Sequence, residues 1–153
     1  TTGLGLIDTT AWYGADAPAA WAERGARAVE KGFGAMVDFQ TTRWFTDGFR
    51  EAHPEVVEGC VATFLANDPA AYAEACRMLG ACDTRVALPN MRIPTAIVVG
   101  REDYATPPDM AEAMHAAIPG ATLTVIEDGR HLTPIEHPKR IAAELMNVVR
   151  AAT

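Results

Sequence analysis

The chain has 153 residues, of which 49% are hydrophobic and 22% charged, and its formal net charge is −7. This composition is typical of an ordinary folded domain with a hydrophobic core. The acidic balance argues against non-specific binding of nucleic acid or of anionic membranes. No apolar run is long enough to cross a bilayer, so we expect neither nucleic acid nor a membrane as a partner.

Three cysteines occur, at Cys60, Cys76 and Cys82. Their number is odd and no C-x-x-C pair is present, which argues against a disulfide framework and against a zinc site. Cys60 and Cys76 lie in apolar helical patterns, as small core residues do. We interpret the cysteines as free thiols in a reducing compartment and predict a cytoplasmic protein.

The chain begins with one predicted strand and continues with a long helical stretch. Residues 3–9, GLGLIDT, are apolar and end in turn formers, which predicts a buried strand in spite of two glycines. Residues 10–90 contain no convincing strand. Gly32 and Asp68 are expected to cap helices there. Four helices are predicted from apolar residues at helical spacing: Trp21, Gly25, Ala28 and Val29; Phe33, Met36 and Val37; Val57, Cys60, Val61 and Phe64; and Tyr72, Cys76 and Leu79.

The C-terminal stretch alternates strands and helices. Residues 95–99, TAIVV, are continuously apolar, as in a parallel strand covered on both faces. The motif Thr106-Pro-Pro-Asp109 predicts a helix with Thr106 as its N-cap, and residues 122–126 predict the next strand. Thr133–Glu136 has the form of a capping box, and Pro138 is expected to start the final helix.

This order of elements predicts an α/β fold. A β-α-β-α series implies a parallel sheet whose strands are joined by helical crossovers. We therefore assign residues 1–9 to a core strand and residues 10–90 to an inserted all-helical cap. Residues 91–153 are assigned to the C-terminal part of the core.

Two candidate catalytic residues follow consecutive predicted strands. Asp103 comes just after residues 95–99, and His131 just after residues 122–126. Ligands of open α/β sheets bind at the carboxyl ends of the strands, and a carboxylate there can orient an imidazole that acts as general base. Glu102 is an alternative acid. The remaining histidines lie in helical or helix-start positions and are interpreted as structural: His53, His115 and His137.

No nucleophile accompanies this pair. The motif G-x-S-x-G, which places a serine on a tight turn between strand and helix, cannot occur because the sequence contains no serine. No two glycines lie four residues apart, which also excludes a cysteine or aspartate turn of that form. We therefore expect the nucleophile on a segment that precedes residue 1.

Several short motifs resemble those of one enzyme superfamily. They are Leu6-Ile-Asp-Thr-Thr10, Arg43-Trp-Phe-Thr46, Tyr72-Ala-Glu-Ala-Cys76, Ile93-Pro-Thr95, Gly100-Arg-Glu-Asp103, Thr106-Pro-Pro108, Ile118-Pro-Gly-Ala121 and His131-Leu-Thr-Pro-Ile-Glu136. Together they span essentially the whole chain and resemble the α/β-hydrolases. The two motifs in the predicted cap, which begin at Arg43 and Tyr72, resemble the 3-oxoadipate enol-lactonases in particular.

The resemblance implies a fold, a reaction and a partner. The chain would be the C-terminal half of an α/β-hydrolase fold with a helical cap, and no cofactor would be required. Asp103 and His131 match the family's catalytic acid and histidine. The implied reaction is hydrolysis of a carboxylic ester or lactone, 3-oxoadipate enol-lactone above all, in bacterial aromatic catabolism. A serine on the N-terminal half would attack the lactone carbonyl, so that half is the expected partner.

Two residues of the predicted cap are candidates for substrate binding. Trp44 is expected to line the pocket, with a packed cap aromatic as the alternative. Arg43 is expected to pair with a substrate carboxylate, with a solvated or salt-bridged arginine as the alternative.

Three other functions stay open. An esterase, an acylhydrolase or a carbon–carbon bond hydrolase would use the same residues on another substrate. An N-terminal-nucleophile enzyme would use Thr1 itself, although such enzymes need stacked sheets. A non-catalytic hydrolase fragment would act as a binding module.

Overall fold

The computed structural model describes all residues from Thr1 to Thr153. The chain forms two compact units. The core unit consists of Thr1–Trp12, Arg43–Thr46 and Thr84–Thr153, and the helical unit consists of Tyr13–Thr42 and Asp47–Asp83. Three stretches within the range assigned to the cap from sequence thus belong to the core unit: residues 10–12, 43–46 and 84–90.

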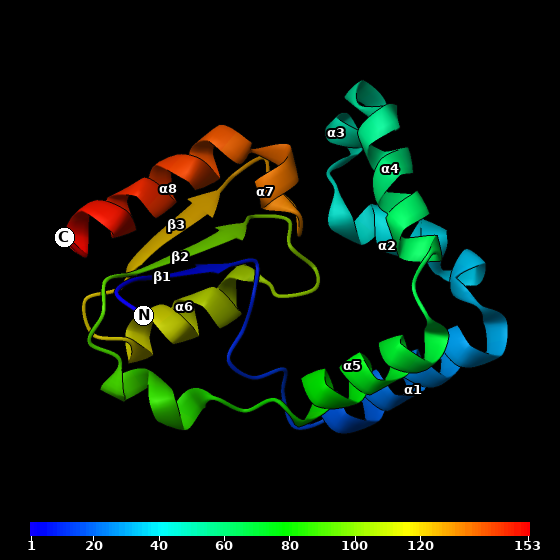
Figure 1. The fold of residues 1–153 in the computed structure, drawn as a ribbon, viewed down its shortest axis with the longest axis horizontal. Coiled ribbons are helices and arrows are strands. Elements are labelled where there is room, and N and C mark those ends of the chain that lie inside the picture. Colours follow the sequence, from blue (N-terminus) through cyan, green and yellow to red (C-terminus); the bar gives the residue numbers. More distant parts are fainter. The chain divides into compact units, whose positions relative to one another are not determined.

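A three-stranded parallel sheet forms the centre of the core unit. Its strands are found where the sequence predicts them, in the order β1-β2-β3, and helices lie on both faces of the sheet (Figure 1). The elements of this unit are β1 (Leu4–Ile7), the short 3₁₀-helix η2 (Arg85–Asn90), β2 (Thr95–Gly100), α6 (Pro108–Ala117), β3 (Thr122–Ile126), α7 (Thr133–Glu136) and α8 (Pro138–Ala151).

Strand β2 is central, and every one of its residues is buried. Its side chains alternate between the faces, as the pleat of a strand requires. Ile97 and Val99 belong to the core cluster that contains Met114 of α6. Val98 packs instead with Ile141 of α8. The continuous apolar run in the sequence therefore reflects burial on both faces of the sheet.

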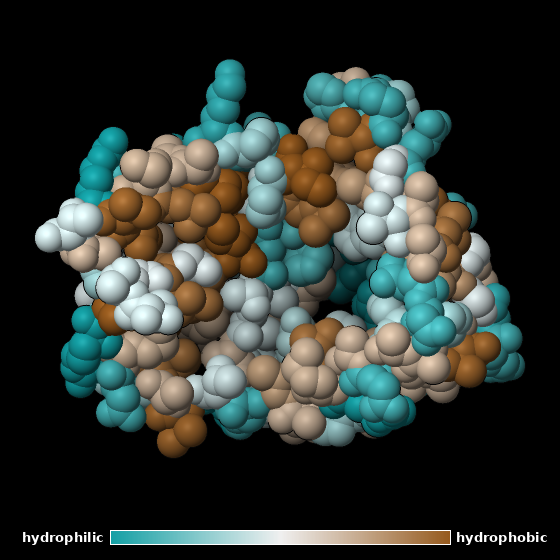
Figure 2. All heavy atoms as spheres, in the orientation of Figure 1, coloured by the Kyte–Doolittle hydropathy of each residue, from teal (hydrophilic) through white to brown (hydrophobic).

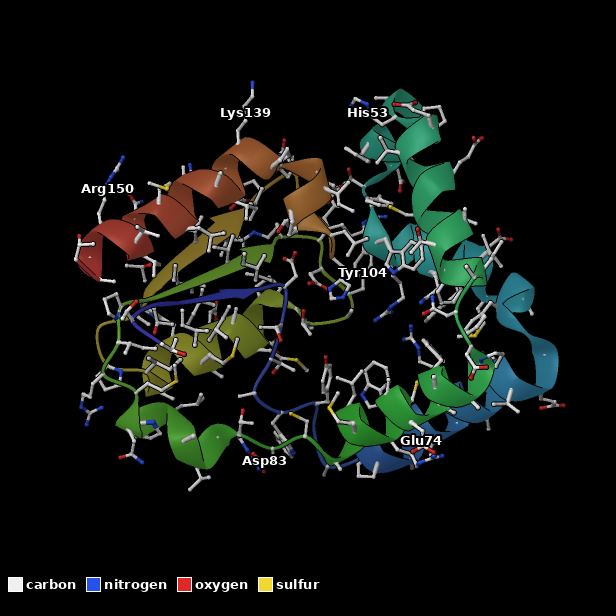
Figure 3. The ribbon with its side chains drawn as sticks, viewed as in Figure 1. His53, Glu74, Asp83, Tyr104, Lys139 and Arg150 are labelled. Atoms are coloured by element: carbon white, nitrogen blue, oxygen red, sulfur yellow. The ribbon has the colours of Figure 1, made fainter.

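The glycines of the first strand are explained by the close approach of α8. A Cβ atom at Gly3 would lie 2.6 Å from Val148 Cγ1, and one at Gly5 would lie 2.5 Å from Leu145 Cδ2. Figure 2 shows apolar side chains gathered along the side of α8 that faces the strands. Lys139 and Arg150 of the same helix point away from the sheet (Figure 3).

The helical unit contains no strand. Helices α1 and α5 pack closely because Gly25 lies against Ala73, and Gly80 lies against the backbone of Ala17. No helix of the structure is both long and apolar enough to span a membrane. Helix α2 continues for two residues into the core unit. The elements are α1 (Ala17–Lys31), the 3₁₀-helix η1 (Phe33–Met36), α2 (Val37–Trp44), α3 (Asp47–Ala52), α4 (Pro54–Leu65) and α5 (Pro69–Ala81).

Two predicted helix caps are confirmed and two are wrong. Gly32 ends α1 with a φ of 70°, and Asp68 accepts a hydrogen bond from Ala71 N at 2.8 Å. Thr106 does not cap α6, because Pro107 occupies the N-cap position and the Thr106 hydroxyl donates to Asp103. Thr133–Glu136 forms the expected single turn without a capping box, since both side chains bond to other segments.

Candidate active site

Polar side chains follow each strand at the carboxyl edge of the sheet. Asp8 comes directly after β1, Asp103 lies on the loop after β2, and His131 lies on the loop after β3. Because parallel strands end at the same edge, these loops meet there. We call residues 101–107 the acid loop and residues 127–132 the His131 loop.

Asp103 is buried, with 2% of its surface exposed, and both carboxylate oxygens are fully engaged. Oδ1 accepts hydrogen bonds from the backbone N–H groups of Ala105 (2.7 Å) and Thr106 (2.9 Å). Oδ2 accepts from the Thr106 hydroxyl (2.9 Å) and lies 2.8 Å from Nδ1 of His131. A carboxylate held by its own loop in this way has a single orientation.

His131 is held by one ring nitrogen and leaves the other available. Its Nδ1 contacts Asp103, while Nε2 has no partner in the protein. The His131 side chain is 25% exposed, whereas that of Asp103 is fully buried. The contact expected from sequence is therefore present. An imidazole fixed at Nδ1 by a carboxylate can take up a proton at Nε2.

The surroundings of Asp103 favour its ionised form. Burial alone would raise the pKa of this carboxyl. The hydrogen bond and charge of His131, together with the N–H groups of Thr106 and Ala105, outweigh burial and hold the pKa of Asp103 below its usual value. An acid that is ionised near neutral pH can orient His131 and stabilise its protonated form.

Gly100, the last residue of β2, lets the His131 loop lie against the strand. A Cβ atom at this position would overlap the carbonyl oxygens of Gly129 and Arg130. The backbone pairing continues beyond the strands, because Glu102 N donates to Gly129 O at 3.0 Å. This close approach brings the acid loop and His131 loop within hydrogen-bonding reach of each other.

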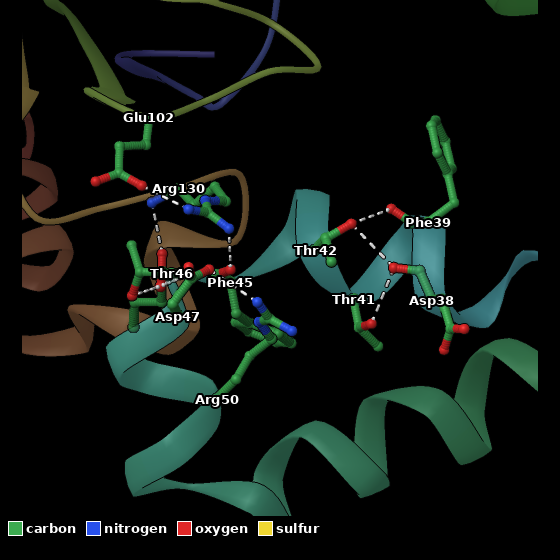
Figure 4. A network of polar contacts seen from close by, with 11 residues as sticks. Asp38, Phe39, Thr41, Thr42, Phe45, Thr46, Asp47, Arg50, Glu102 and Arg130 are labelled. Carbon is green, nitrogen blue, oxygen red and sulfur yellow. Dashed lines mark hydrogen bonds and ion pairs between the residues drawn. The ribbon is translucent and has the colours of Figure 1, made fainter.

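Arg130, the residue before His131, is held in place by its side-chain contacts. Its guanidinium donates to Glu102 Oε2 at 2.6 Å and to the carbonyl oxygen of Phe45 at 2.9 Å (Figure 4). Glu102, the alternative acid, therefore pairs with Arg130 and makes no hydrogen bond with His131. The structure favours Asp103 as the partner of the histidine.

Glu136 fixes the same loop from its other side. Its Oε2 accepts from Arg130 N at 2.6 Å, and its Oε1 accepts from both the N–H (2.7 Å) and hydroxyl (2.8 Å) of Thr46. In addition, Leu132 N donates to the Trp44 carbonyl at 2.9 Å. The segment Arg43–Thr46 thus supports the backbone on both sides of His131.

The structure places the two predicted substrate-binding residues in this supporting segment. The Arg43 guanidinium donates to the carbonyl oxygen of Tyr104, a residue of the acid loop that is labelled in Figure 3. The half-buried Trp44 packs edge to face against Phe45, with ring centroids 6.3 Å apart. Both residues have a structural contact, and their role toward a substrate stays a prediction.

Asp8 is a site residue that sequence analysis did not single out. Its Oδ2 accepts from Thr133 N (2.9 Å) and from the Thr133 hydroxyl (2.7 Å), while its Oδ1 is buried without a partner. Burial raises the pKa of Asp8 to about 6, against the lowering effect of Thr133 and with a smaller raising effect of the Asp103 charge. Its place directly after a strand was the available signal.

The remaining polar candidates do not join the site. His53 and His137 stand at the start of helices, and His115 lies on the exposed side of α6. No group of three or more histidine, cysteine or acidic side chains has a geometry suited to a metal ion.

Comparison with known proteins places this geometry in a family. The chain matches the alpha/beta hydrolase family over residues 3–144. It is 31% identical over 120 residues to 3-oxoadipate enol-lactonase 2 of Acinetobacter baylyi, an alignment that covers 78% of this chain and 45% of that protein.

Two solved structures are similar over nearly the whole chain. The enol-lactonase of Burkholderia xenovorans LB400 gives a TM-score of 0.89 at 27% identity, covering 95% of this chain and 55% of that one. A thermophilic esterase from Thermogutta terrifontis, solved with malate bound, gives 0.88 at 29% identity, covering 99% and 56%. The chain thus spans about half the length of these relatives. From the family match and these similarities, the chain belongs to the alpha/beta hydrolase family.

Proposed function

We propose that the chain supplies the acid and the general base of a serine hydrolase that acts on a carboxylic ester or lactone. The observation that carries the proposal is the 2.8 Å contact between Asp103 and His131 at the carboxyl edge of the sheet. The nucleophile would lie outside residues 1–153, because the chain has no serine. The open Nε2 of His131 is the atom that would receive its proton.

In the proposed reaction, the serine hydroxyl attacks the acyl carbonyl while His131 Nε2 removes its proton. The oxygen of the leaving group takes that proton as its bond to the acyl carbon breaks, and an acyl-enzyme remains. His131 then removes a proton from water as the water attacks the acyl group. It returns that proton to the serine oxygen as the bond from this oxygen to the acyl carbon breaks, which releases the carboxylic acid. Asp103 stabilises the protonated imidazole in both halves of the reaction.

The proposed substrate is 3-oxoadipate enol-lactone. Support comes from similarity to two enol-lactonases, one by sequence and one by structure. The esterase that is equally similar favours a second candidate, a simple carboxylic ester. One relative is named for 3-oxoadipate and the esterase was solved with malate bound, and both compounds are dicarboxylic acids. We therefore propose substrates that carry a free carboxylate besides the ester or lactone group.

A second polypeptide segment, the N-terminal half of the hydrolase, is the proposed partner. Strand β1 pairs with β2 on one side only, and its residues are half-buried, whereas those of β2 are buried. Apolar side chains of α8 are also exposed: Leu145, Met146 and Val149. An open edge leaves unpaired backbone N–H and C=O groups to which a further strand can bind, so we propose that the partner covers this edge and carries the nucleophile.

The partner is tested by expressing residues 1–153 alone and then with the upstream half added in trans. We expect the added half to raise the urea midpoint of unfolding and to create esterase activity. A chain that unfolds cooperatively as a stable monomer, with activity unchanged by the added half, would overturn the proposal.

The proposed reaction is tested by replacing His131 in the protein that contains the nucleophile. We expect His131→Ala to abolish hydrolysis of 3-oxoadipate enol-lactone and of p-nitrophenyl esters alike. The matched control is His115→Ala, which removes an exposed histidine of α6. Near-normal turnover by His131→Ala would refute the assigned base, and faster turnover of simple esters by the wild type would favour the second candidate.

The proposed compartment is the cytoplasm. Cys60, Cys76 and Cys82 are all free thiols. Burial raises the pKa of the Cys60 and Cys76 thiols, so they stay protonated and unreactive. Free thiols persist in reducing compartments. Cell fractionation that finds the protein in an oxidising compartment would contradict the proposal.

A further inference from the structure

The helical unit contains a pocket of its own. It has a volume of about 410 Å³ and lies between α1, η1 and α2. Trp21, Met36 and Phe39 give it apolar walls, and Arg24 and Arg27 bring positive charge to it. A mostly apolar pocket with a few polar groups is the usual form of a small-molecule site.

Arg24 is held in place by neutral partners. Its Nε donates to the Tyr72 hydroxyl and its NH2 group to Gln40 Oε1, each at 2.7 Å. The guanidinium carbon lies 5.1 Å from the centre of the Trp21 ring and 5.6 Å from that of Phe39. These contacts from α1, α2 and α5 orient the guanidinium in advance.

The positive charge of Arg24 is not compensated within the helical unit. Its partners do not carry negative charge, because Gln40 is an amide and burial raises the pKa of the Tyr72 phenol. Glu23, the acid that lines the pocket, pairs with Arg27 at 3.0 Å. A partly buried cation without a counter-ion is unfavourable. The N–H groups of Arg24 that remain unused can bind an anion.

We propose that Arg24 binds a carboxylate of a small dicarboxylic acid or of its ester in this pocket. Arginine suits this task because its planar fork matches a carboxylate in a bidentate pair. Trp21 and Phe39 would contact the hydrocarbon part of the ligand. Binding of the dicarboxylic acid does not depend on the proposed hydrolase function. Only the further step, that an ester of this acid is the substrate, rests on that function.

The first experiment measures binding without catalysis. Adipate is titrated into the wild-type protein by calorimetry, with dimethyl adipate as the uncharged analogue. We expect adipate to bind and dimethyl adipate not to bind. Arg24→Gln should weaken adipate binding by about tenfold to a hundredfold, as expected for loss of a charged hydrogen-bonded pair. Arg77→Gln, which removes an exposed arginine of α5 that does not line the pocket, is the matched control and should change the affinity by less than about threefold.

The second experiment needs no variant, so it holds even if Arg24→Gln fails to fold. The Nε–H resonance of Arg24 is followed by NMR in the wild-type protein during the adipate titration, and it should shift in step with calorimetric binding. An absent shift, equal binding of dimethyl adipate, or equal effects of the Arg24 and Arg77 variants would overturn the proposal. If adipate binds through Arg24 but no ester or lactone is hydrolysed, the proposed function fails and the carboxylate site stands.

Discussion

The loops after β1 and β2 each place an aspartate at the same edge of the sheet, and the two carboxyl groups behave differently. Asp103 has hydrogen-bond partners on both oxygens, and its pKa lies below the usual value. Asp8 has partners on one oxygen only, and burial raises its pKa to about 6. Position after a strand therefore brings an acid to the site, while burial, hydrogen-bond donors and nearby charge together set the direction in which its pKa moves.

The difference also separates two tasks. An acid that orients a histidine must keep its charge, and Asp103 does so because the acid loop folds around it. Asp8 instead anchors Thr133, which follows the His131 loop. Its buried, unpartnered oxygen is a destabilising feature that a protonated carboxyl tolerates better than an ionised one. The following changes test each side of this comparison.

The largest expected effect is that of Asp103→Asn on hydrolysis by the protein that contains the nucleophile. The amide cannot accept the Nδ1 proton in the same way and favours the wrong tautomer of His131, which lowers kcat by about 10⁴-fold in comparable sites. Steady-state kinetics on an ester substrate would measure it. Glu102→Gln is the control and should lower kcat less than about tenfold. Equal losses of kcat in the two variants would refute the assignment of Asp103 as the partner of His131.

Gly100→Ala should disrupt the contact that brings the two loops together. The added methyl group would overlap the backbone of Gly129 and Arg130, so the His131 loop must move away from β2. We expect a loss of about 4 kcal/mol in the free energy of unfolding, since backbone cannot yield as a side chain can. Urea unfolding measures it. Gly59→Ala, in an open part of α4, should instead be neutral or stabilising. Equal stability of both variants would contradict the close approach.

Glu136→Gln should loosen the His131 loop. The amide keeps only one acceptor oxygen, so either Arg130 N or Thr46 N would face the amide nitrogen, which cannot accept a hydrogen bond. The loss of charged hydrogen bonds is expected to cost on the order of 3 kcal/mol of stability. The control is Glu127→Gln, which removes an exposed pair with Arg101 and should leave stability nearly unchanged. Thermal unfolding of both variants would show the contrast, and its absence would mean that Glu136 does not support the loop.

Sequence patterns predicted the elements of the core because burial leaves a local trace. The run at residues 95–99 indicates β2, and the positions of Asp103 and His131 after neighbouring strands predict their contact. Helix α3 was missed because it has no buried residue and hence no apolar stripe. Local signals are therefore sufficient where one segment determines its own environment.

Hydroxyl and carboxylate partners could not be predicted in the same way. Thr106 and Thr133 both resemble helix caps in sequence, yet their hydroxyls bond to Asp103 and Asp8. Thr133 and Asp8 are 125 residues apart, so no local pattern relates them. Glu136 likewise bonds to Thr46 across 90 residues. A polar side chain that satisfies a distant group has the same local sequence as one that caps its own helix.

The smallest expected effect is the pH dependence that Asp8 adds to stability. Its folded pKa of about 6 lies above the usual value of 3.8, so the folded state holds a proton that the unfolded state releases between these values. Stability from this group is therefore complete below about pH 4, falls as pH rises to about 6, and stays constant above that. The fall should be on the order of 2 kcal/mol after allowance for solvent screening.

In Asp8→Asn the amide imitates the protonated acid, because its oxygen can still accept from Thr133, and the fall in stability with pH should disappear. Urea unfolding of the wild type and variant at pH 4, 5, 6 and 7 measures it, with the exposed Asp16→Asn as the control. Parallel curves for wild type and Asp8→Asn would show that Asp8 is ionised like Asp103, and the contrast between the two loops would then be lost.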